Sequence, residues 1–483
     1  MLDIIVFAVI FIITLIVATI YFCTGEAKTT AGKVGATSKQ QITGEEGEDS
    51  PMPGWSPEQS EEKLAAISSY HELLAELHQK HGPVAAFWMQ GKHFISLASP
   101  GLFKQHSYPF DRPMEIMEPF APACGSECLP FLMGDAVRAR RRLFDQHFSH
   151  DGVAIYCDML QEVANDLAAA LAAFPKGQHV PIGEHVMKAT LTAIIHAMVG
   201  PGELNVTQIN TYLKHYNVVW YMLDKIGGFR AEAGTSERAN FDKSVEAMHS
   251  IFRTVVTRRK ESGGSDQQWP LDIFIQAGLS DQQQLHETMN SIIAGFHTSG
   301  RMLQWCLYFL SLHEDIQEQL YQEIDEQLGG QDVKPEVIPQ LPYLRQVIEE
   351  TLRCAKVLPY MVRTQPADGQ IGGYSVKAGT IVFHAFGVVW EDPTIYPHPE
   401  QFDPDRFTEE NRKKLPPYAF EPFGFAGGRK CVGFRFVYLE ATVILCTLIR
   451  RFRFRLVEGQ TITPYYGLVT RPAEEIWLTV EQR

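Results

Sequence analysis

A single cysteine among glycines near the C-terminus constrains the fold more than any other feature of the sequence. Cys431 lies in the run 423–433, which leads into a long apolar stretch that predicts a helix. A cysteine at a helix start beside Arg429 and Lys430 is expected to ionise readily, and the thiolate is the form that binds metal. Glycines such as Gly433 let a flat cofactor approach the backbone. We therefore expect Cys431 to be an axial metal ligand; the alternative is a buried free thiol.

The first 23 residues predict a membrane anchor. Residues 4–23 carry no charge, and about 20 apolar residues are what a helix needs to cross a bilayer. The run is longer than the apolar part of a cleaved signal peptide, so we expect it to be retained. Lysines follow the run and only Asp3 precedes it, which predicts that the rest of the protein faces the cytosol. The alternative is a buried core helix.

Composition describes the remainder of the 483 residues. Residues 24–58 are rich in Gly, Ser, Thr, Lys and Glu and predict a flexible linker, whereas residues 59–483 predict one large globular domain. A formal net charge of -14 argues against a nucleic-acid-binding surface. The eight cysteines show neither disulfide nor zinc spacing, which indicates a reducing compartment.

Hydrophobic periodicity predicts a mixed α and β fold. Leucines at helical spacing predict one amphipathic helix over residues 64–77, with His71 and His78 on its solvated face. Two β-rich runs around Gly91 predict a hairpin over residues 84–97. Helical patterns then dominate to about residue 355, and residues 380–383 predict a strand.

Three further motifs precede Cys431, and each is weak by itself. Residues 294–298 (Ala-Gly-Phe-His-Thr) place a glycine and a threonine inside a helical pattern, where both are poor helix formers. Their alternative interpretation is a packing notch between two helices. Glu350 and Arg353 form an i, i+3 acid–base pair, and residues 134–142 form a helix with four arginines, most of which are expected in solvent.

Together and in this order, the motifs resemble those of the cytochromes P-450. Gly427-x-Arg429-x-Cys431-x-Gly433 is similar to the haem-binding signature of that superfamily, although Gly424 stands where a phenylalanine is usual. The resemblance implies a haem b cofactor (iron protoporphyrin IX) with Cys431 as the iron ligand. It also implies the cytochrome P-450 fold, mainly α with a smaller β-rich part, here preceded by one transmembrane helix.

Residues 294–298 resemble the oxygen-activation motif of the long distal helix, which opens over the haem in this superfamily. The resemblance implies that the hydroxyl of Thr298 takes part in proton relay. His297 stands where the family usually has an acid, and a histidine can also relay protons near neutral pH. We therefore assign Thr298 and His297 as the catalytic pair.

The resemblance also implies a structural and a cofactor-binding set of charged residues. Glu350, Arg353 and Arg406 resemble the network that fixes the cysteine loop, with no part in the chemistry. The arginines expected to bind the haem propionates are Arg141, Arg363 and Arg429. Val137 replaces the tryptophan that usually precedes the first of these.

Within the superfamily, the chain looks most like the orphan animal branch called family twenty. The implied activity is that of a monooxygenase, an oxidoreductase acting on paired donors with incorporation of molecular oxygen. It would insert one oxygen atom of O2 into a lipophilic small molecule, with electrons from an NADPH-dependent flavoprotein reductase and with cytochrome b5 as a second donor. The implied location is the endoplasmic reticulum membrane, single-pass, with the lipid bilayer as a partner.

A basic surface on the cysteine side of the haem would suit an acidic reductase. The residues that we expect to form it are Arg138, Arg140, Arg142, Lys413, Lys414, Lys430 and Arg435.

Two other function classes remain open. One is a haem-thiolate isomerase or dehydratase that needs no reductase, which His297 in place of the acid supports. The other is a haem-binding protein without turnover, which the altered phenylalanine and tryptophan positions support.

Overall fold

The computed structural model describes residues 51–483 except 68, 225–233, 264–267 and 426–428. The predicted anchor (1–23) and residues 24–50 of the predicted linker lie outside the described residues. Among the helices that the structure describes, none is both long enough and apolar enough to cross a bilayer.

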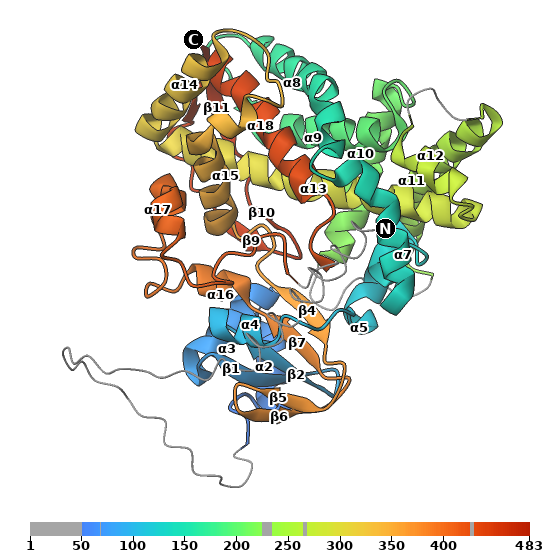
Figure 1. Cartoon of the computed structure of the whole chain (residues 1–483), viewed down its shortest axis with the longest axis vertical. Helices are drawn as coiled ribbons and strands as arrows, with labels where there is room; N and C mark the ends of the chain where they lie inside the picture. The colour runs from blue at the N-terminus through green and yellow to red at the C-terminus, as the bar shows by residue number, and fades with distance from the viewer. Residues whose placement is uncertain (1–50, 68, 225–233, 264–267, 426–428) are drawn as a thin grey trace, which may run out of the picture. The chain divides into compact units, whose positions relative to one another are not determined.

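One long helix, α13, runs through the middle of the helical part (Figure 1). It spans Asp281–Leu312 and begins with a capping box, in which the Ser280 hydroxyl accepts from the Gln283 N–H. Its main neighbour is α9 (Ile182–Val199). A Cβ at Gly295 would lie 2.4 Å from Cγ1 of Ile194, so this glycine allows the two helices to approach closely. The packing-notch interpretation therefore holds for Gly295.

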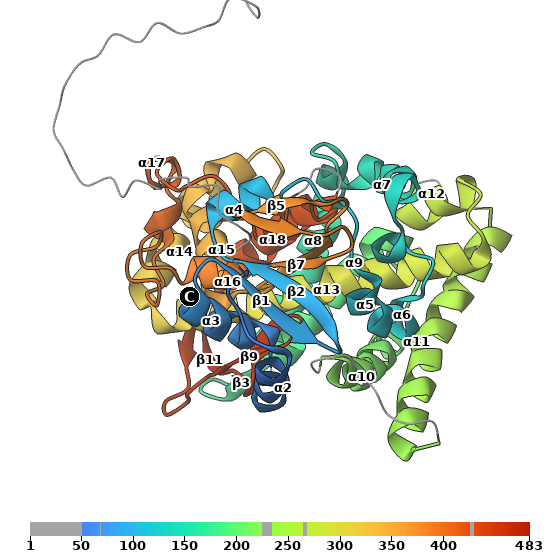
Figure 2. The same cartoon turned by 90° about the horizontal axis from the view of Figure 1, so that it is seen from below.

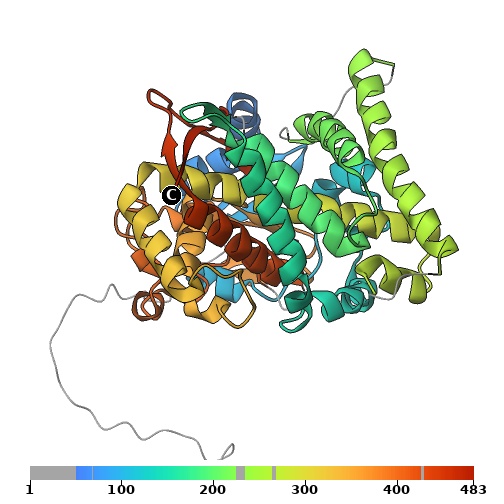
Figure 3. The same ribbon diagram turned by 90° about the horizontal axis from the view of Figure 1, so that it is seen from above.

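The other helices surround α13. The longer ones are α7 (Gly134–Phe148), α8 (Cys157–Ala172), α10 (Val206–Leu223), α11 (Ser236–Glu261), α14 (Glu314–Leu328), α15 (Pro342–Ala355) and α18 (Phe434–Arg451). The shorter ones are α2 (Pro57–Ala66), α3 (Tyr70–His81), α4 (Pro100–Gln105), α5 (Met114–Met117), α6 (Ala121–Cys124), α12 (Pro270–Gln276), α16 (Phe386–Trp390) and α17 (Glu409–Arg412). Figure 3 shows α18 in red beside α8 in teal.

The largest sheet joins distant parts of the chain, as the blue and orange strands in Figures 1 and 2 show. Its order is β1 (Val84–Met89), β2 (Lys92–Leu97), β7 (Ile381–His384) and β4 (Met361–Thr364). β1 and β2 form the predicted hairpin, whose two-residue turn, Gln90 and Gly91, has positive φ angles of 54° and 71°. β2 and β7 are parallel, whereas β4 and β7 are antiparallel.

Three smaller sheets complete the β structure of the described residues. They are β3 (His179–Pro181), β11 (Trp477–Gln482) and β8 (Phe452–Leu456); β9 (Pro464–Tyr466) with β10 (Thr470–Pro472); and β5 (Gly369–Ile371) with β6 (Tyr374–Val376). The predicted class, helix-rich with a smaller β part, is confirmed.

The N-terminal helical region differs from the prediction. The single helix expected over residues 64–77 is two helices, α2 and α3, because Ser69 begins a new one by accepting from the Glu72 N–H. The expected solvation of His71 and His78 is wrong, since both are buried. His78 bonds the carbonyl of Gly82 and the hydroxyl of Ser96, each at 2.7 Å, and burial lowers its pKa to about 4.

Candidate active site

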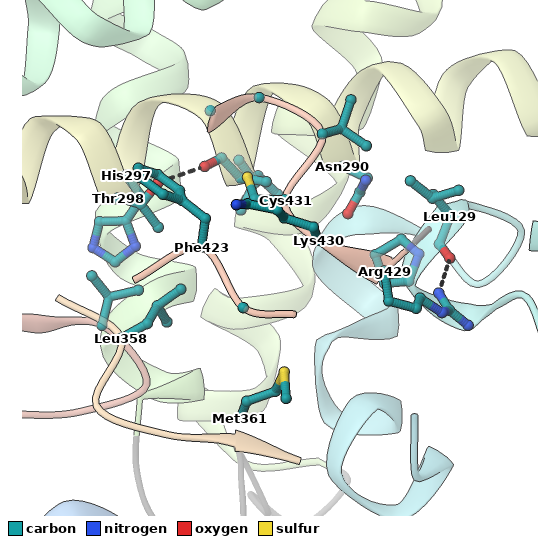
Figure 4. Close-up of a pocket in the computed structure, with 18 of the residues that line it drawn as sticks. Leu129, Asn290, His297, Thr298, Leu358, Met361, Phe423, Arg429, Lys430 and Cys431 are labelled. Atoms are coloured by element: carbon teal, nitrogen blue, oxygen red, sulfur yellow. Dashed lines mark hydrogen bonds between the residues drawn. The ribbon is translucent and has the colours of Figure 1, made fainter. Parts of the chain in front are cut away.

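The predicted site residues meet at one cavity of about 460 Å³ below α13. Cys431 lines it from the loop before α18, Thr298 from α13, Arg141 from α7 and Arg363 from β4. In Figure 4 the sulfur of Cys431 points toward the α13 ribbon. The structure therefore brings together a cysteine, a helix with a threonine and two arginines that are far apart in the sequence.

The cysteine loop is fixed by its backbone. The N–H of Cys431 donates to the carbonyl of Phe423 at 3.0 Å, and Gly433 is the N-cap of α18. The sulfur is free and exposed to the cavity that it lines. Burial nevertheless raises the pKa of the Cys431 thiol, while the Gly433 N–H and Arg141 lower it. The protein alone therefore does not provide the easy ionisation that we expected, and a bound metal cation would supply the missing charge.

Arg429 does not contribute to that ionisation in the expected way. Its guanidinium turns to the segment 110–132, which contains α5 and α6, and donates to the carbonyls of Phe110 (3.0 Å), Leu129 (3.3 Å) and Leu132 (2.5 Å). Figure 4 shows the bond to Leu129. Arg429 lines the cavity, but its clearest role is to tie the cysteine loop to a segment about 300 residues earlier.

Sequence reasoning missed a fourth arginine at the cavity. Arg112 lies in the segment between α4 and α5 and lines the cavity. It stands between Asp111 and Pro113, and this short sequence predicts neither a helix nor a strand. Burial lowers the pKa of Arg112, and so does the nearby Arg141. Only a resemblance extending to this segment would have found it, because an isolated arginine in a loop has no periodic pattern.

These arginines repel one another. Burial and then Arg112 lower the pKa of Arg363 to about 9 and that of Arg429 to about 10. Within the described ranges, only Arg429 has a carboxylate at ion-pair distance, Asp111 at 3.7 Å. The cluster therefore carries positive charge that the described carboxylates do not balance.

The residues present fit haem. The two propionates of haem would balance the arginines, and Nε of Arg363 is buried without a hydrogen-bond partner in the part of the chain that the structure describes. A Cβ added at Gly433 would meet nothing within 4 Å, so the backbone leaves open space at the cavity. Cys431 supplies a soft sulfur ligand for the iron.

Two family positions are altered around this loop. Gly424 has a φ of +71°, and a Cβ there would lie 3.3 Å from Sδ of Met361. The following Phe425 is buried and packs edge-on against His384, with ring centroids 5.0 Å apart. Val137, at the usual tryptophan position, is buried on α7 and lines the cavity.

Thr298 faces the cavity from a continuous helix. Its hydroxyl donates to the carbonyl of Ala294 at 2.9 Å, as Figure 4 shows. Residues 294–298 are regular α-helix, so the helix opening that the resemblance implied does not occur in this structure. Thr298 is therefore positioned at the cavity, with its proton engaged by the helix itself.

His297 is sealed away from solvent. It is 1% exposed and lies edge-on to Trp220 of α10, with ring centroids 4.3 Å apart. Neither ring nitrogen has a hydrogen-bond partner among the described residues. Burial, and then Arg301 and Arg471, hold the pKa of His297 well below its usual value. The imidazole is therefore neutral, and the predicted relay near neutral pH has no hydrogen-bonded partner here.

The structure brings together the three residues of the predicted network. Arg353 makes two bonds of 2.7 Å to the carboxylate of Glu350, and Nε of Arg406 lies 3.3 Å from the same carboxylate. Arg353 also donates to the carbonyls of Trp390 and Pro399. Glu350 and Arg353 are each at most 1% exposed, so this is a buried, fully bonded network distinct from the cavity lining.

Comparison with known proteins agrees with a haem-thiolate site in a P450 fold. The family model described as Cytochrome P450 matches residues 63–480, so the chain belongs to the cytochrome P450 family. This family consists of haem-dependent monooxygenases, and its members bind iron protoporphyrin IX through a cysteine thiolate.

Individual relatives show which members of the family the chain is similar to. The chain is 30% identical over 489 residues to Cytochrome P450 20A1 of Homo sapiens, and the match covers 100% of both chains. It is 27% identical over 339 residues to Cyclooctat-9-en-7-ol 5-monooxygenase of Streptomyces melanosporofaciens, covering 68% of this chain and 73% of the relative. The haem domain of cytochrome P450DA has a TM-score of 0.81 at 21% identity, covering 90% of this chain and 98% of that domain. The predicted likeness to family twenty is confirmed.

Proposed function

We propose that the protein inserts one oxygen atom of O2 into a lipophilic small molecule at this cavity. The observation that carries the proposal is that Cys431, from the loop before α18, and Thr298, from α13, line one cavity together with four arginines. Haem bound through a thiolate supplies O2 activation, because thiolate donation favours O–O cleavage. Cys431 would hold the iron, and Arg112, Arg141 and Arg363 would hold the propionates.

The chain's own residues shape what can enter. Apolar side chains from α5, α10 and the segment before β10 line the cavity and exclude water from the reacting group. Thr298 holds its proton in a bond to Ala294, so it must turn away from that carbonyl before it can donate into the cavity. A lipophilic substrate suits both this lining and the membrane anchor that residues 4–23 predict.

We propose an NADPH-dependent flavoprotein reductase as the electron donor, with cytochrome b5 as a second donor. Of the seven basic residues expected on the docking surface, Arg140 instead pairs with buried Glu287 at 2.5 Å. Arg138 pairs with Asp135 on α7. Lys413 and Lys414, which follow α17, pair with the carboxylates of Glu409 and Glu410 on that helix. Lys430 and Arg435 flank the ring of Phe434 beside Cys431, and we infer that they are the better-placed contacts. The proposed location is the endoplasmic reticulum membrane.

A second candidate function, a haem-thiolate isomerase or dehydratase, rests on His297. A neutral, sealed histidine at the position of the usual acid weakens proton delivery, which such enzymes do not need. NADPH consumption with purified reductase separates the two: consumption coupled to oxygenated product supports the monooxygenase, and rearrangement without NADPH supports the isomerase.

The first test is the ferrous carbon monoxide difference spectrum. The wild type should show the red-shifted Soret band typical of a thiolate ligand, and Cys431→Ala should lose it. Cys124→Ala is the matched control, because Cys124 also lines the cavity and should keep the band. A histidine-type band in the wild type, or an unchanged band in Cys431→Ala, would refute Cys431 as the ligand.

A further inference from the structure

Two cysteines lie side by side where α6 ends. Cys124 is the last residue of α6 and lines the cavity, whereas Cys128 is 0% exposed. The Cys128 thiol donates to the carbonyls of Gly125 at 3.2 Å and of Cys124 at 3.7 Å. Burial, and then a hydrogen bond with the side chain of Cys124, raise the pKa of Cys128. The two sulfur atoms are therefore neighbours, and Cys124 is the one at the cavity.

Histidines of two other helices hold the short turn between the cysteines. Nε2 of His249 on α11 lies 3.0 Å from the carbonyl oxygen of Ala123. The N–H of Glu127 donates to Nδ1 of His286 on α13 at 3.3 Å. Gly125 has a φ of +84°, and a Cβ there would lie 2.1 Å from the ring of His286. Glycine therefore allows the close turn that folds the chain back onto the end of α6.

We propose that Cys124 and Cys128 form a redox-sensitive dithiol, which hydrogen peroxide converts to a disulfide. Peroxide in the cavity oxidises the sulfur of Cys124 to a sulfenic acid: an S–O bond forms, the O–O bond breaks and water leaves. The sulfur of Cys128 then displaces the hydroxyl group as a second water, and the S–S bond forms. The two sulfur atoms give two electrons to the peroxide, and both thiol protons leave in the two water molecules.

The inference goes beyond the proposed oxygenation and does not depend on it, because disulfide formation needs neither turnover nor a reductase. A reversible disulfide also agrees with the reducing compartment that the cysteine pattern indicates, since disulfides in such compartments are usually transient or redox-sensing. Burial makes most thiols inert, so the opening of Cys124 to the cavity is what gives this pair access to a small oxidant.

The disulfide would act on the segment that contacts the cysteine loop. A disulfide has no S–H donor, so the carbonyls of Phe120 and Gly125 lose the thiols that now donate to them. Leu129 follows Cys128 directly and lines the cavity, and its carbonyl accepts from Arg429 of the cysteine loop. Oxidation should therefore shift this contact and change the shape of the cavity.

Peptide mass spectrometry of the full-length haem protein tests the disulfide. The protein is treated with a slight molar excess of hydrogen peroxide, unfolded, alkylated and digested with trypsin without reductant. The tryptic peptide 105–138 contains Cys124 and Cys128 and no other cysteine. After peroxide it should lack two hydrogen atoms and carry no alkyl group, and dithiothreitol should restore both thiols.

Two other cysteines of the same protein provide the matched control. Cys157 and Cys446 are also buried, but they lie outside the cavity lining that the structure describes, so they should remain thiols. Thiols that persist at Cys124 and Cys128, or equal oxidation of all four cysteines, would overturn the proposal. This measurement uses the wild type alone, so it does not depend on the folding of any variant.

Cys128→Ser separates disulfide formation from oxidation of one sulfur. Without its partner thiol, Cys124 should proceed to the sulfinic acid, which dithiothreitol does not reverse. In spectral titration, oxidised wild type should bind 4-phenylimidazole about five- to tenfold more weakly, as expected for one lost hydrogen bond, and dithiothreitol should restore the affinity. Peroxide-treated Cys128→Ser should show no such recovery. An unchanged affinity in the oxidised wild type would refute the effect on the cavity.

Discussion

Two buried polar regions of this protein differ in how well their groups are paired. In the Glu350 network (Glu350, Arg353 and Arg406), every nitrogen of the Arg353 guanidinium donates to a carboxylate or a carbonyl. In the His297 cluster (His297, Tyr216, Trp220 and Arg301), five polar atoms lack a partner in the described structure: both ring nitrogens of His297, the Tyr216 hydroxyl, Nε1 of Trp220 and Nε of Arg301.

The difference in pairing distinguishes a region that stabilises the fold from a region that borders the candidate active site. A fully bonded network has one arrangement, and this network ties α15 to the segment 390–406, whereas unpaired buried groups are retained at a cost in stability. Natural proteins keep such exceptions mainly at functional sites. The His297 cluster borders the catalytic cavity, and it contains the residue at which the sequence departs from the family motif.

The largest change in the free energy of unfolding is expected for a substitution that breaks the Glu350 network. Arg353→Ala would remove the partner of Oε2 of buried Glu350 and leave Arg406, at 3.3 Å, as its one remaining charged partner among the described residues, which should reduce the free energy of unfolding by about 3–5 kcal/mol. Urea unfolding and haem content measure it. Arg253→Ala is the matched control: its pair with Glu246 is exposed, so the change should stay below about 1 kcal/mol. Equal effects of the two variants would contradict the contrast.

Glu440 on α18 is a buried glutamate that, unlike Glu350, forms no ion pair with an arginine of the described residues. It therefore allows a paired and an unpaired buried carboxyl group to be compared. It is 0% exposed, and neither carboxyl oxygen has a hydrogen bond of good geometry among the described residues. Burial raises its pKa to about 8, although the nearby Ser299 lowers it. The folded state then holds a proton that the unfolded state releases above about pH 4.5, so the stability of the protein falls as pH rises toward 8.

Glu440→Gln should remove that dependence. Between pH 5 and pH 8 the wild type should lose on the order of a few kcal/mol relative to the variant, because one pKa unit corresponds to about 1.4 kcal/mol. Urea midpoints of both proteins at the two pH values measure the difference. Parallel pH profiles would show that Glu440 is paired or ionised in the folded protein.

The smallest change in the free energy of unfolding is expected for a substitution in the His297 cluster. Tyr216→Phe removes a buried hydroxyl that has no described partner, so stability should change by less than about 0.5 kcal/mol or increase. Tyr396→Phe is the control, because its hydroxyl donates to the carbonyl of Ala419 and should cost about 1 kcal/mol. A larger loss for Tyr216→Phe would indicate that its hydroxyl is hydrogen-bonded, for instance to buried water.

The sequence was most informative where local chemistry or the resemblance specified a position. The hairpin at Gly91 follows from a turn that needs positive φ, and the resemblance located Cys431, Thr298, Arg141 and Arg363, which the structure brings to one cavity.

The sequence was least informative for residues whose position in space depends on segments that are distant in the chain. Arg112 lies in a loop, and only the fold carries it to the cavity. His78 was expected in solvent because helical periodicity does not reveal that β2 covers that face and that Ser96 bonds its ring. The same applies to His297, whose neutral state is set by burial and by Arg301 and Arg471.

The pairing of β2 with β7 has a consequence for synthesis on the ribosome. β2 ends at Leu97, but its partner begins at Ile381. At about 5–20 residues per second, the hairpin waits roughly 15–60 s for the strand that completes its edge. During that time its unpaired edge is open to contact with other nascent chains. Production of this protein should therefore depend on chaperones that shield the N-terminal third of the chain until translation is nearly finished.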